Sequence, residues 1–255
     1  MNLNHWKKFI NEGISDTGKH NMKYYAFDWD DNIVEMPTKI IMIDEQGQEV
    51  GMTTSDFALY RSKVGKEPFE YEGHQIKDFA KDSFRGFRLV GDKAFIKDAM
   101  TAELGPAWND FVECINSGSI FAIITARGHN PTTMKRAVYN YIMADFNGID
   151  QGQLRSNIKK YNKIFGKYNK DASVKGYLDM CKFYPVSFGT MAAASPEQGK
   201  VKAFREFIDY CKKLNKGAKI SMGFSDDDRK NMDIIEKHFS NEDGLAKLVL
   251  KYTGK

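Results

Sequence analysis

The sequence has little of what secreted, membrane or zinc-binding proteins need. Its 255 residues include three cysteines, Cys114, Cys181 and Cys211. Their number is odd and their spacing matches no metal-binding pattern, which favours reduced thiols. No apolar run approaches the length of a membrane span, and the first residues lack the apolar core of a signal peptide. We therefore expect a cytoplasmic protein that makes no contact with membranes.

Neither sign of charge dominates the chain. Lys and Arg number 38 against 34 Asp and Glu, which leaves a net charge of +4. Such a balance does not indicate a general affinity for polyanions. Aromatic residues make up 13% of the chain, and this content favours a packed core over disorder. The length suits one large domain or a core with an inserted cap.

Short apolar strands alternate with helices along most of the chain. Strands are expected at 24–27, 120–125, 185–188, 219–225 and 248–250. Helices are expected at 4–12, 54–62, 93–117 with a break near Gly105, 131–146, 173–182, 195–214 and 231–239. This alternation predicts an α/β fold with a Rossmann-like, mostly parallel sheet and helices on both faces.

Three carboxylates follow the first apolar strand. Asp28, Asp30 and Asp31 fall within four positions, where the strand should end. Ligands of parallel α/β sheets bind at the carboxyl ends of the strands. Acids packed this closely need a cation, and Mg²⁺ fits because it takes one or two carboxylates and keeps waters for a phosphate. An acidic turn after a strand is the alternative for this stretch taken alone.

Two further strand ends and one helix start carry groups that suit phosphoryl transfer. Thr125 ends the second strand, and Asp226 and Asp227 follow the strand at 219–225. Lys200 lies near the start of the helix between them. In such chemistry a carboxylate attacks phosphorus, a metal neutralises the oxygens, and a hydroxyl and a lysine hold the transferring group.

This ordered set resembles the motifs of the haloacid dehalogenase-like (HAD) phosphohydrolases. In that family an apolar strand with Asp-x-Asp comes first, then a strand ending in Thr, then a lysine, then a strand ending in an acidic pair. The matching stretches here are Asp28-Trp29-Asp30, Ile123-Ile124-Thr125, Lys200 with Lys202 as the alternative, and Phe224-Ser225-Asp226-Asp227. They occur in the family's order across residues 23–252.

The resemblance implies a Mg²⁺-dependent phosphatase that hydrolyses a phosphomonoester. Asp28 would be the nucleophile that forms an aspartyl-phosphate, and Asp30 the general acid and base. Thr125, Ala126 and Lys200 would bind the phosphoryl group. The metal would be held by Asp28, by the backbone carbonyl of Asp30, and by Asp226 and Asp227, either of which is the first acidic ligand of the last motif.

Several neighbouring residues have two interpretations each. Asp31-Asn32 stands where many members of the family have Gly-Thr, and Asn32 can still bond locally to backbone and retain the turn. Arg127 either grips a second substrate oxyanion, because guanidinium suits phosphate, or forms a surface salt bridge. His129 is either a pocket residue or a surface residue. Asn231 and Asp233 lie where the family sometimes has a further polar support.

The resemblance also suggests how the chain divides. Residues 1–34 and 106–255 would form the HAD-like catalytic core, and 35–105 an inserted cap that closes over the site and selects substrate. Within 35–105, residues 39–52 have a hairpin pattern with Gly47 in the turn. The aromatic stretch 57–88 would complete the cap, although its elements cannot be assigned from the pattern.

A basic insertion within the core, 148–172, allows a second interpretation of function. Its part 155–170 contains basic residues interleaved with aromatics: Arg155, Lys159, Lys160, Lys163, Lys167 and Lys170, with Tyr161, Phe165 and Tyr168. This composition is typical either of a nucleic-acid contact or of a solvated helix face. In the first case the segment should lie on the side of the site, and the enzyme would be a polynucleotide or nucleotide end phosphatase. A catalytically inert binding module with the same fold is another alternative, and the substrate and oligomeric state stay open.

Overall fold

The protein is described from a computed structural model that covers residues 22–88, 91–165, 173–188, 195–216 and 219–254. The helix expected at 4–12 lies outside these residues, and so do Lys167, Tyr168 and Lys170. Across the described ranges, no helix combines the length and the apolar composition that crossing a bilayer requires.

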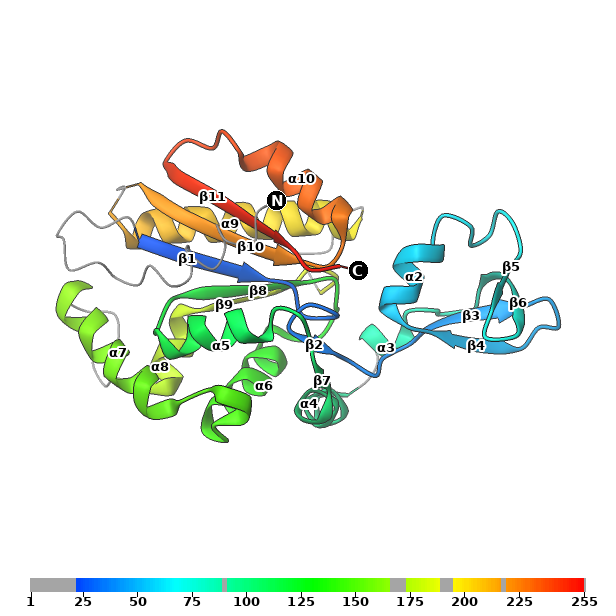
Figure 1. Ribbon diagram of the computed structural model, residues 1–255, viewed down its shortest axis with the longest axis horizontal. Coiled ribbons are helices and arrows are strands. Elements are labelled where there is room, and N and C mark those ends of the chain that lie inside the picture. The colour runs from blue at the N-terminus through cyan, green and yellow to red at the C-terminus, as the bar shows by residue number, and fades with distance from the viewer. Residues whose placement is uncertain (1–21, 89–90, 166–172, 189–194, 217–218, 255) are drawn as a thin grey trace.

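The main body is built on a five-stranded sheet whose strands all run parallel (Figure 1). Their order is β11-β10-β1-β8-β9. The strands are β1 (Met22–Phe27), β8 (Phe121–Thr125), β9 (Lys182–Pro185), β10 (Ile220–Asp226) and β11 (Leu245–Tyr252). The predicted α/β class is confirmed, and the main sheet is wholly parallel where mostly parallel was expected. β1 pairs with both β8 and β10, so the carboxyl ends of these three strands meet at one edge of the sheet.

Helices cover both faces of this sheet because its strands are apolar on both sides. Alternate residues of β1 enter two separate cores: Tyr25 and Phe27 pack in one, Tyr24 and Ala26 in the other. The first face is covered by α4 (Asp92–Thr101), α5 (Trp108–Asn116), α6 (Pro131–Met143), α7 (Gln151–Phe165) and α8 (Val174–Met180), with the turn η1 (Phe146–Gly148) after α6. The other face is covered by α9 (Pro196–Leu214) and α10 (Arg229–Phe239).

Capping residues start three helices just after the strand ends. Asn130 accepts a hydrogen bond from the Thr132 N–H before α6, and Ser195 accepts one from Gln198 before α9. Both α6 and α9 have a proline at the first position, where a helix N–H has no partner within the helix and its loss costs nothing. Asp228 caps α10 through the Lys230 N–H. These helices therefore present their amino ends near the edge where β1, β8 and β10 end.

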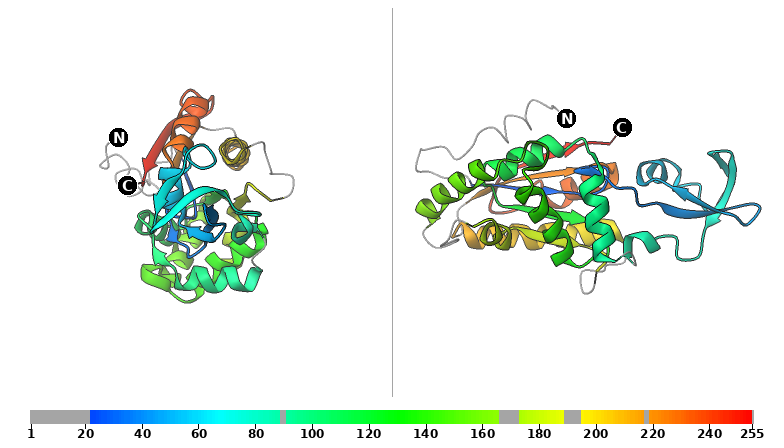
Figure 2. Two further views of the ribbon diagram at one scale, coloured as in Figure 1. Left: turned by 90° about the vertical axis from the view of Figure 1, so that its right-hand side faces the viewer. Right: turned by 90° about the horizontal axis from the view of Figure 1, so that it is seen from below.

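A smaller body projects from that edge (Figures 1 and 2). It has a four-stranded antiparallel sheet, order β4-β3-β6-β5, and its own hydrophobic cluster. The expected hairpin at 39–52 is confirmed: Ile43 pairs with Glu49, and Gly47 has a φ of +80° in the turn. Its elements are β3 (Ile40–Asp44), β4 (Glu49–Met52), α2 (Thr54–Tyr60), β5 (Phe69–Tyr71), β6 (His74–Phe79) and α3 (Arg85–Arg88).

The connection between the two bodies passes through β2 (Val34–Glu35) and β7 (Glu103–Leu104), which pair antiparallel. The range 35–105 expected as a cap also contains α4, whose Phe95 and Ala99 pack in the core of the main body. The single interrupted helix expected at 93–117 is two helices, α4 and α5, separated by β7. The basic segment 148–172 contains α7, whose Leu154 and Ile158 are buried in the same core.

Gly105 brings the return strand against the loop that follows β1. Its N–H donates to the Ile33 carbonyl at 2.9 Å. A Cβ at this position would lie 2.4 Å from the Asn32 carbonyl oxygen and 2.7 Å from its carbonyl carbon. Both contacts are with backbone, so a side chain at position 105 forces the loop to move.

We predict that Gly105→Ala lowers the free energy of unfolding by about 2 kcal/mol, because overpacking against backbone strains the fold. Gly91→Ala is the matched control, since a Cβ there meets no atom within 4 Å. Urea denaturation of both variants measures the difference. Equal stability of the two variants would contradict the close approach at Gly105.

Candidate active site

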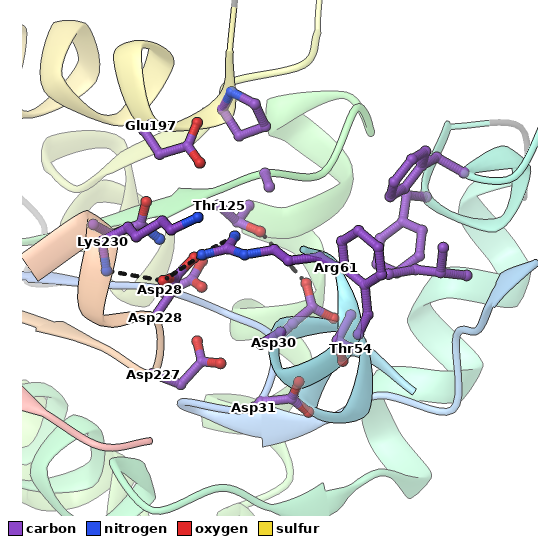
Figure 3. Close-up of a pocket in the computed structure, with 18 of the residues that line it drawn as sticks. Asp28, Asp30, Asp31, Thr54, Arg61, Thr125, Glu197, Asp227, Asp228 and Lys230 are labelled. Atoms are coloured by element: carbon purple, nitrogen blue, oxygen red, sulfur yellow. Dashed lines mark hydrogen bonds and ion pairs between the residues drawn. The ribbon is translucent and has the colours of Figure 1, made fainter. Parts of the chain in front are cut away.

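The predicted acids, hydroxyl and lysine meet at the carboxyl edge of the parallel sheet, where Figure 3 labels Asp28, Asp30, Thr125 and Asp227. Asp28 follows β1, and its N–H donates to the Ser225 carbonyl of β10 at 2.9 Å. Thr125 is the last residue of β8 and Asp226 the last of β10. Lys200 comes from the first turns of α9. The arrangement follows from topology, because β1 lies between the other two strands.

Asn32 fixes the turn that carries the first acids. Its amide nitrogen donates to the Asp28 and Ser225 carbonyls, both at 3.1 Å. Its amide oxygen accepts from the hydroxyls of Ser225 and Thr253, both at 2.8 Å. The side chain is fully buried and fully hydrogen-bonded, and Asp31 takes a φ of +53°, which aspartate tolerates. The expected turn is retained, with Asn32 connecting it to β10.

Lys200 lies between two buried carboxylates. Its Nζ is 2.7 Å from Oδ2 of Asp226 and 3.0 Å from Oδ2 of Asp28, and the residue is 2% exposed. Burial alone would lower the pKa of Lys200, but the two carboxylates raise it above its usual value. Lys202, the alternative for this motif, is exposed. Of the two lysines, Lys200 is therefore the one at the site.

Asp28, Asp226 and Asp227 form a group that suits a divalent cation. Each offers a carboxylate oxygen, and these atoms lie within 4.8 Å of one another. Oδ1 of Asp28 is buried and has no hydrogen-bond partner among the described residues. Burial raises the pKa of Asp28 to about 8, against the pull of Lys200, and raises that of Asp227 to about 9. One lysine does not balance this crowding, and hard oxygen donors of this kind fit Mg²⁺.

Asp226 is the most firmly held of these acids. Its Oδ1 accepts from the Asp228 N–H at 2.9 Å and from the Asn231 amide at 3.0 Å. Asn231 thus gives the polar support that was expected of it. Asp233 does not, because it lies at the surface in an ion pair with Arg229.

Arg127 corrects a prediction. Its guanidinium binds Asp30 through two nitrogens, with Nε at 2.9 Å from Oδ2 and Nη2 at 2.6 Å from Oδ1, and also donates to Thr38. The group is 1% exposed and packs over the rings of Phe87 and Phe95. It is neither a surface salt bridge nor a residue of the cavity wall. Its donors are directed at Asp30, so Arg127 orients this carboxylate instead of gripping a substrate oxyanion.

Of the other candidates in and after the second motif, Thr125 and Ala126 line the cavity described next and His129 is buried in the core. The Thr125 hydroxyl accepts from the Arg127 N–H at 3.3 Å. His129 is buried against the ring of Phe95, with 4.6 Å between centroids, and is not among the lining residues. The possible pocket role of His129 is therefore wrong.

A cavity of about 660 Å³ lies between the carboxyl edge and the smaller body (Figure 3). Asp28, Asp30, Thr125, Lys200 and Asp227 line its inner end. A bidentate ion pair crosses between the bodies: Arg61, the residue that follows α2, binds Asp228 with N–O distances of 3.0 and 3.1 Å. The other lining residues that the sequence motifs did not identify include Phe57, Lys66, Phe84, Arg88, Glu197 and Lys230. The aromatic content of 57–88 was the one signal for this wall.

The basic helix α7 lies at the end of the main body opposite to the smaller body (Figures 1 and 2). Arg155, Lys159 and Lys160 are exposed there, and no described residue of 148–165 lines the cavity. The described part of the segment, 148–165, therefore lies away from the site, contrary to what the nucleic-acid interpretation expects. α6 carries the chain away from the end of β8, and α7 begins only after that helix has run its length.

Comparisons with protein-family models, with curated proteins and with solved structures find no match for this chain. The likeness to HAD phosphohydrolases therefore rests on the order of the motifs. In the structure Asp28, Thr125 and Lys200 line one cavity, and Lys200 pairs with both Asp28 and Asp226.

We predict that Mg²⁺ stabilises the protein against heat. A cation held at 100 times its Kd adds about 2.7 kcal/mol, which raises the Tm of a domain of this size by about 5 °C or more. Asp227→Asn should remove this shift, because it takes away one donor without touching the Lys200 ion pairs. Asp233→Asn, an exposed acid on α10, should keep it. An equal Mg²⁺ shift in all three proteins, or none in the parent, would contradict the metal site.

Proposed function

We propose that this protein is a Mg²⁺-dependent phosphatase of the HAD type, which hydrolyses a phosphomonoester through an aspartyl-phosphate on Asp28. The main body would be the HAD-like core and the smaller body its cap. The observation that carries the proposal is the buried Oδ1 of Asp28, which has no hydrogen-bond partner in the part of the chain that the structure describes, in a residue that lines the cavity with Thr125, Lys200 and Asp227. A buried carboxylate oxygen without a hydrogen bond is costly to keep, and a nucleophile needs a free lone pair.

The proposed reaction has two steps. Oδ1 of Asp28 attacks phosphorus, the ester bond breaks, and the leaving oxygen takes a proton from Asp30. Asp30 then takes a proton from a water that attacks the aspartyl-phosphate at phosphorus, which releases phosphate and restores Asp28. Mg²⁺, when bound, supplies positive charge that offsets the charge of the phosphoryl oxygens.

In the proposal, Lys200, Thr125 and Arg127 position the reacting groups and offset their negative charge. The Lys200 ammonium, held between Asp28 and Asp226, keeps one oxygen of Asp28 in place and leaves the other for attack. In the proposed reaction the Thr125 hydroxyl donates to a phosphoryl oxygen. Arg127 holds the Asp30 carboxylate from the side away from the cavity, so Asp30 is a pre-oriented group for proton transfer.

We predict that Asp28→Asn lowers turnover of an aryl phosphate by roughly a thousandfold or more, since it removes the nucleophile and keeps its shape. Release of phosphate with Mg²⁺ present measures this, and excess EDTA should abolish the activity of the parent protein. Asp233→Asn is the control and should match the parent. A parent protein that turns over no phosphomonoester supports the inert binding module instead.

We predict that the loss caused by Asp30→Asn depends on the leaving group. An alkyl alcohol needs a proton as it departs, whereas a nitrophenolate does not, so general-acid catalysis matters more for the alkyl ester. The variant should lose about 100-fold more turnover on an alkyl phosphate than on 4-nitrophenyl phosphate. Rapid-quench measurement of the first step isolates this effect. Equal losses on both esters would remove Asp30 from the role of acid.

A further inference from the structure

The cavity wall from the smaller body combines aromatic rings with positive charge. Its apolar part comes from α2, β3 and the segment around α3. The rings and cations of this wall are Phe57, Phe84 and Phe87 with Arg61, Lys66 and Arg88. Lys230, from the first turn of α10, adds a cation on the side of the main body (Figure 3).

The cations of the cavity fall into two groups. Lys200 is paired with Asp28 and Asp226, and Arg61 with Asp228. The side chains of Lys66, Arg88 and Lys230 form no ion pair with any residue in the described ranges. Three cations therefore line the cavity without a neutralising partner of their own.

Phe84 offers an open ring at the same wall. It is 36% exposed and meets Phe57 and Phe87 at steep angles, with centroid distances of 5.9 and 6.2 Å, whereas the ring of Phe79 is tilted by 38° at 5.9 Å. Edge contacts of this kind leave part of the ring surface without a protein partner. A flat aromatic group stacked on Phe84 would cover it.

Arg88 is held at a fixed place relative to the inner end of the cavity. The Phe87 carbonyl accepts a hydrogen bond of 3.1 Å from the Gly128 N–H, three residues after Thr125. A Cβ on Gly128 would lie 3.1 Å from Cγ of Arg88, so the stem of Arg88 lies directly on this loop. The guanidinium extends from an anchored stem, which suits recognition of a second anion at a defined distance from Asp28.

We propose that the leaving group of the substrate carries both a flat aromatic ring and a second anionic group, the combination found in nucleoside bisphosphates. This inference rests on the proposed phosphatase activity. The ring stacks on Phe84, and Arg88 with Lys66 or Lys230 binds the second anion, while the scissile phosphoryl group lies at Asp28. A cavity of about 660 Å³ holds a ligand of this size and is far larger than a phosphate alone needs.

Four substrates test the contributions of the aromatic ring and of the second anionic group separately. Adenosine 3′,5′-bisphosphate has ring and second anion, adenosine 5′-monophosphate the ring alone, fructose 1,6-bisphosphate the anion alone, and glycerol phosphate neither. We expect kcat/KM for the adenosine bisphosphate to exceed that for each of the other three by about tenfold or more. Similar values for the adenosine bisphosphate and monophosphate, or for the two bisphosphates, would overturn the inference.

Two variants test the residues, each with a matched control. Arg88→Ser should lower the ratio of kcat/KM for adenosine bisphosphate over monophosphate about tenfold, and Phe84→Ala should lower the ratio of adenosine bisphosphate over fructose bisphosphate by a similar factor. Arg85→Ser is the control for the cation, because Arg85 lies in the same helix, pairs with Glu49 and is not in the wall. Phe79→Ala is the control for the ring, because Phe79 is 39% exposed in the same ring cluster and does not line the cavity. Unchanged ratios in Arg88→Ser and Phe84→Ala would also overturn the inference.

Calorimetric binding to Asp28→Asn protein separates the inference from the activity on which it rests. A Kd for adenosine bisphosphate about tenfold below that for the monophosphate supports the ligand class even if no substrate is turned over, and in that case the phosphatase proposal alone fails. Turnover of a simple aryl phosphate together with equal Kd values for both nucleotides leaves the phosphatase standing and refutes the ligand class.

Discussion

The site depends on one buried ammonium placed between two buried carboxylates. Asp28, Asp226 and Lys200 are each 6% exposed or less, so their charges act in a medium that screens them poorly. A lone carboxylate at either position would be strongly disfavoured, whereas the shared lysine keeps both at the strand ends. The same pairing occupies one oxygen of Asp28 and leaves the other open. The negative charge that Lys200 does not balance is the reason for proposing a divalent cation at this site.

The fold brings this charge arrangement about through strand order. β1 lies between β8 and β10, so three strand ends, at Phe27, Thr125 and Asp226, come to one edge. Asn32 then connects the loop after β1 to β10 through Ser225, a contact across 193 positions. The smaller body adds the outer wall, held to the main body by the Arg61–Asp228 ion pair. In the proposed function, the chemistry takes place at the sheet edge, and the smaller body contributes to the choice of ligand.

The sequence predicts the inner end of the site better than its outer wall, for a physical reason. Asp28, Thr125 and Asp226 lie at the ends of apolar strands. An apolar strand followed by a polar residue is a local pattern, so it can be recognised in the sequence. The burial of Arg127 against Phe95 and Phe87, and the pairing of Arg61 with Asp228 across 167 positions, depend on tertiary contacts that leave no periodic pattern. The basic composition of α7 likewise gave a wrong position for that helix. Basic residues indicate an exposed helix face, but they do not indicate at which end of the molecule the face lies.

Covalent trapping at Asp28 tests the central claim most directly. The protein, Mg²⁺ and a phosphomonoester are mixed, quenched during turnover and treated with borohydride, which reduces an aspartyl-phosphate to homoserine. Peptide mass spectrometry then reads positions 28, 30, 226 and 227. The account predicts homoserine at position 28 alone, and only when substrate is present. Steady release of phosphate with an unmodified Asp28, or with the modification at Asp30, Asp226 or Asp227, would contradict it.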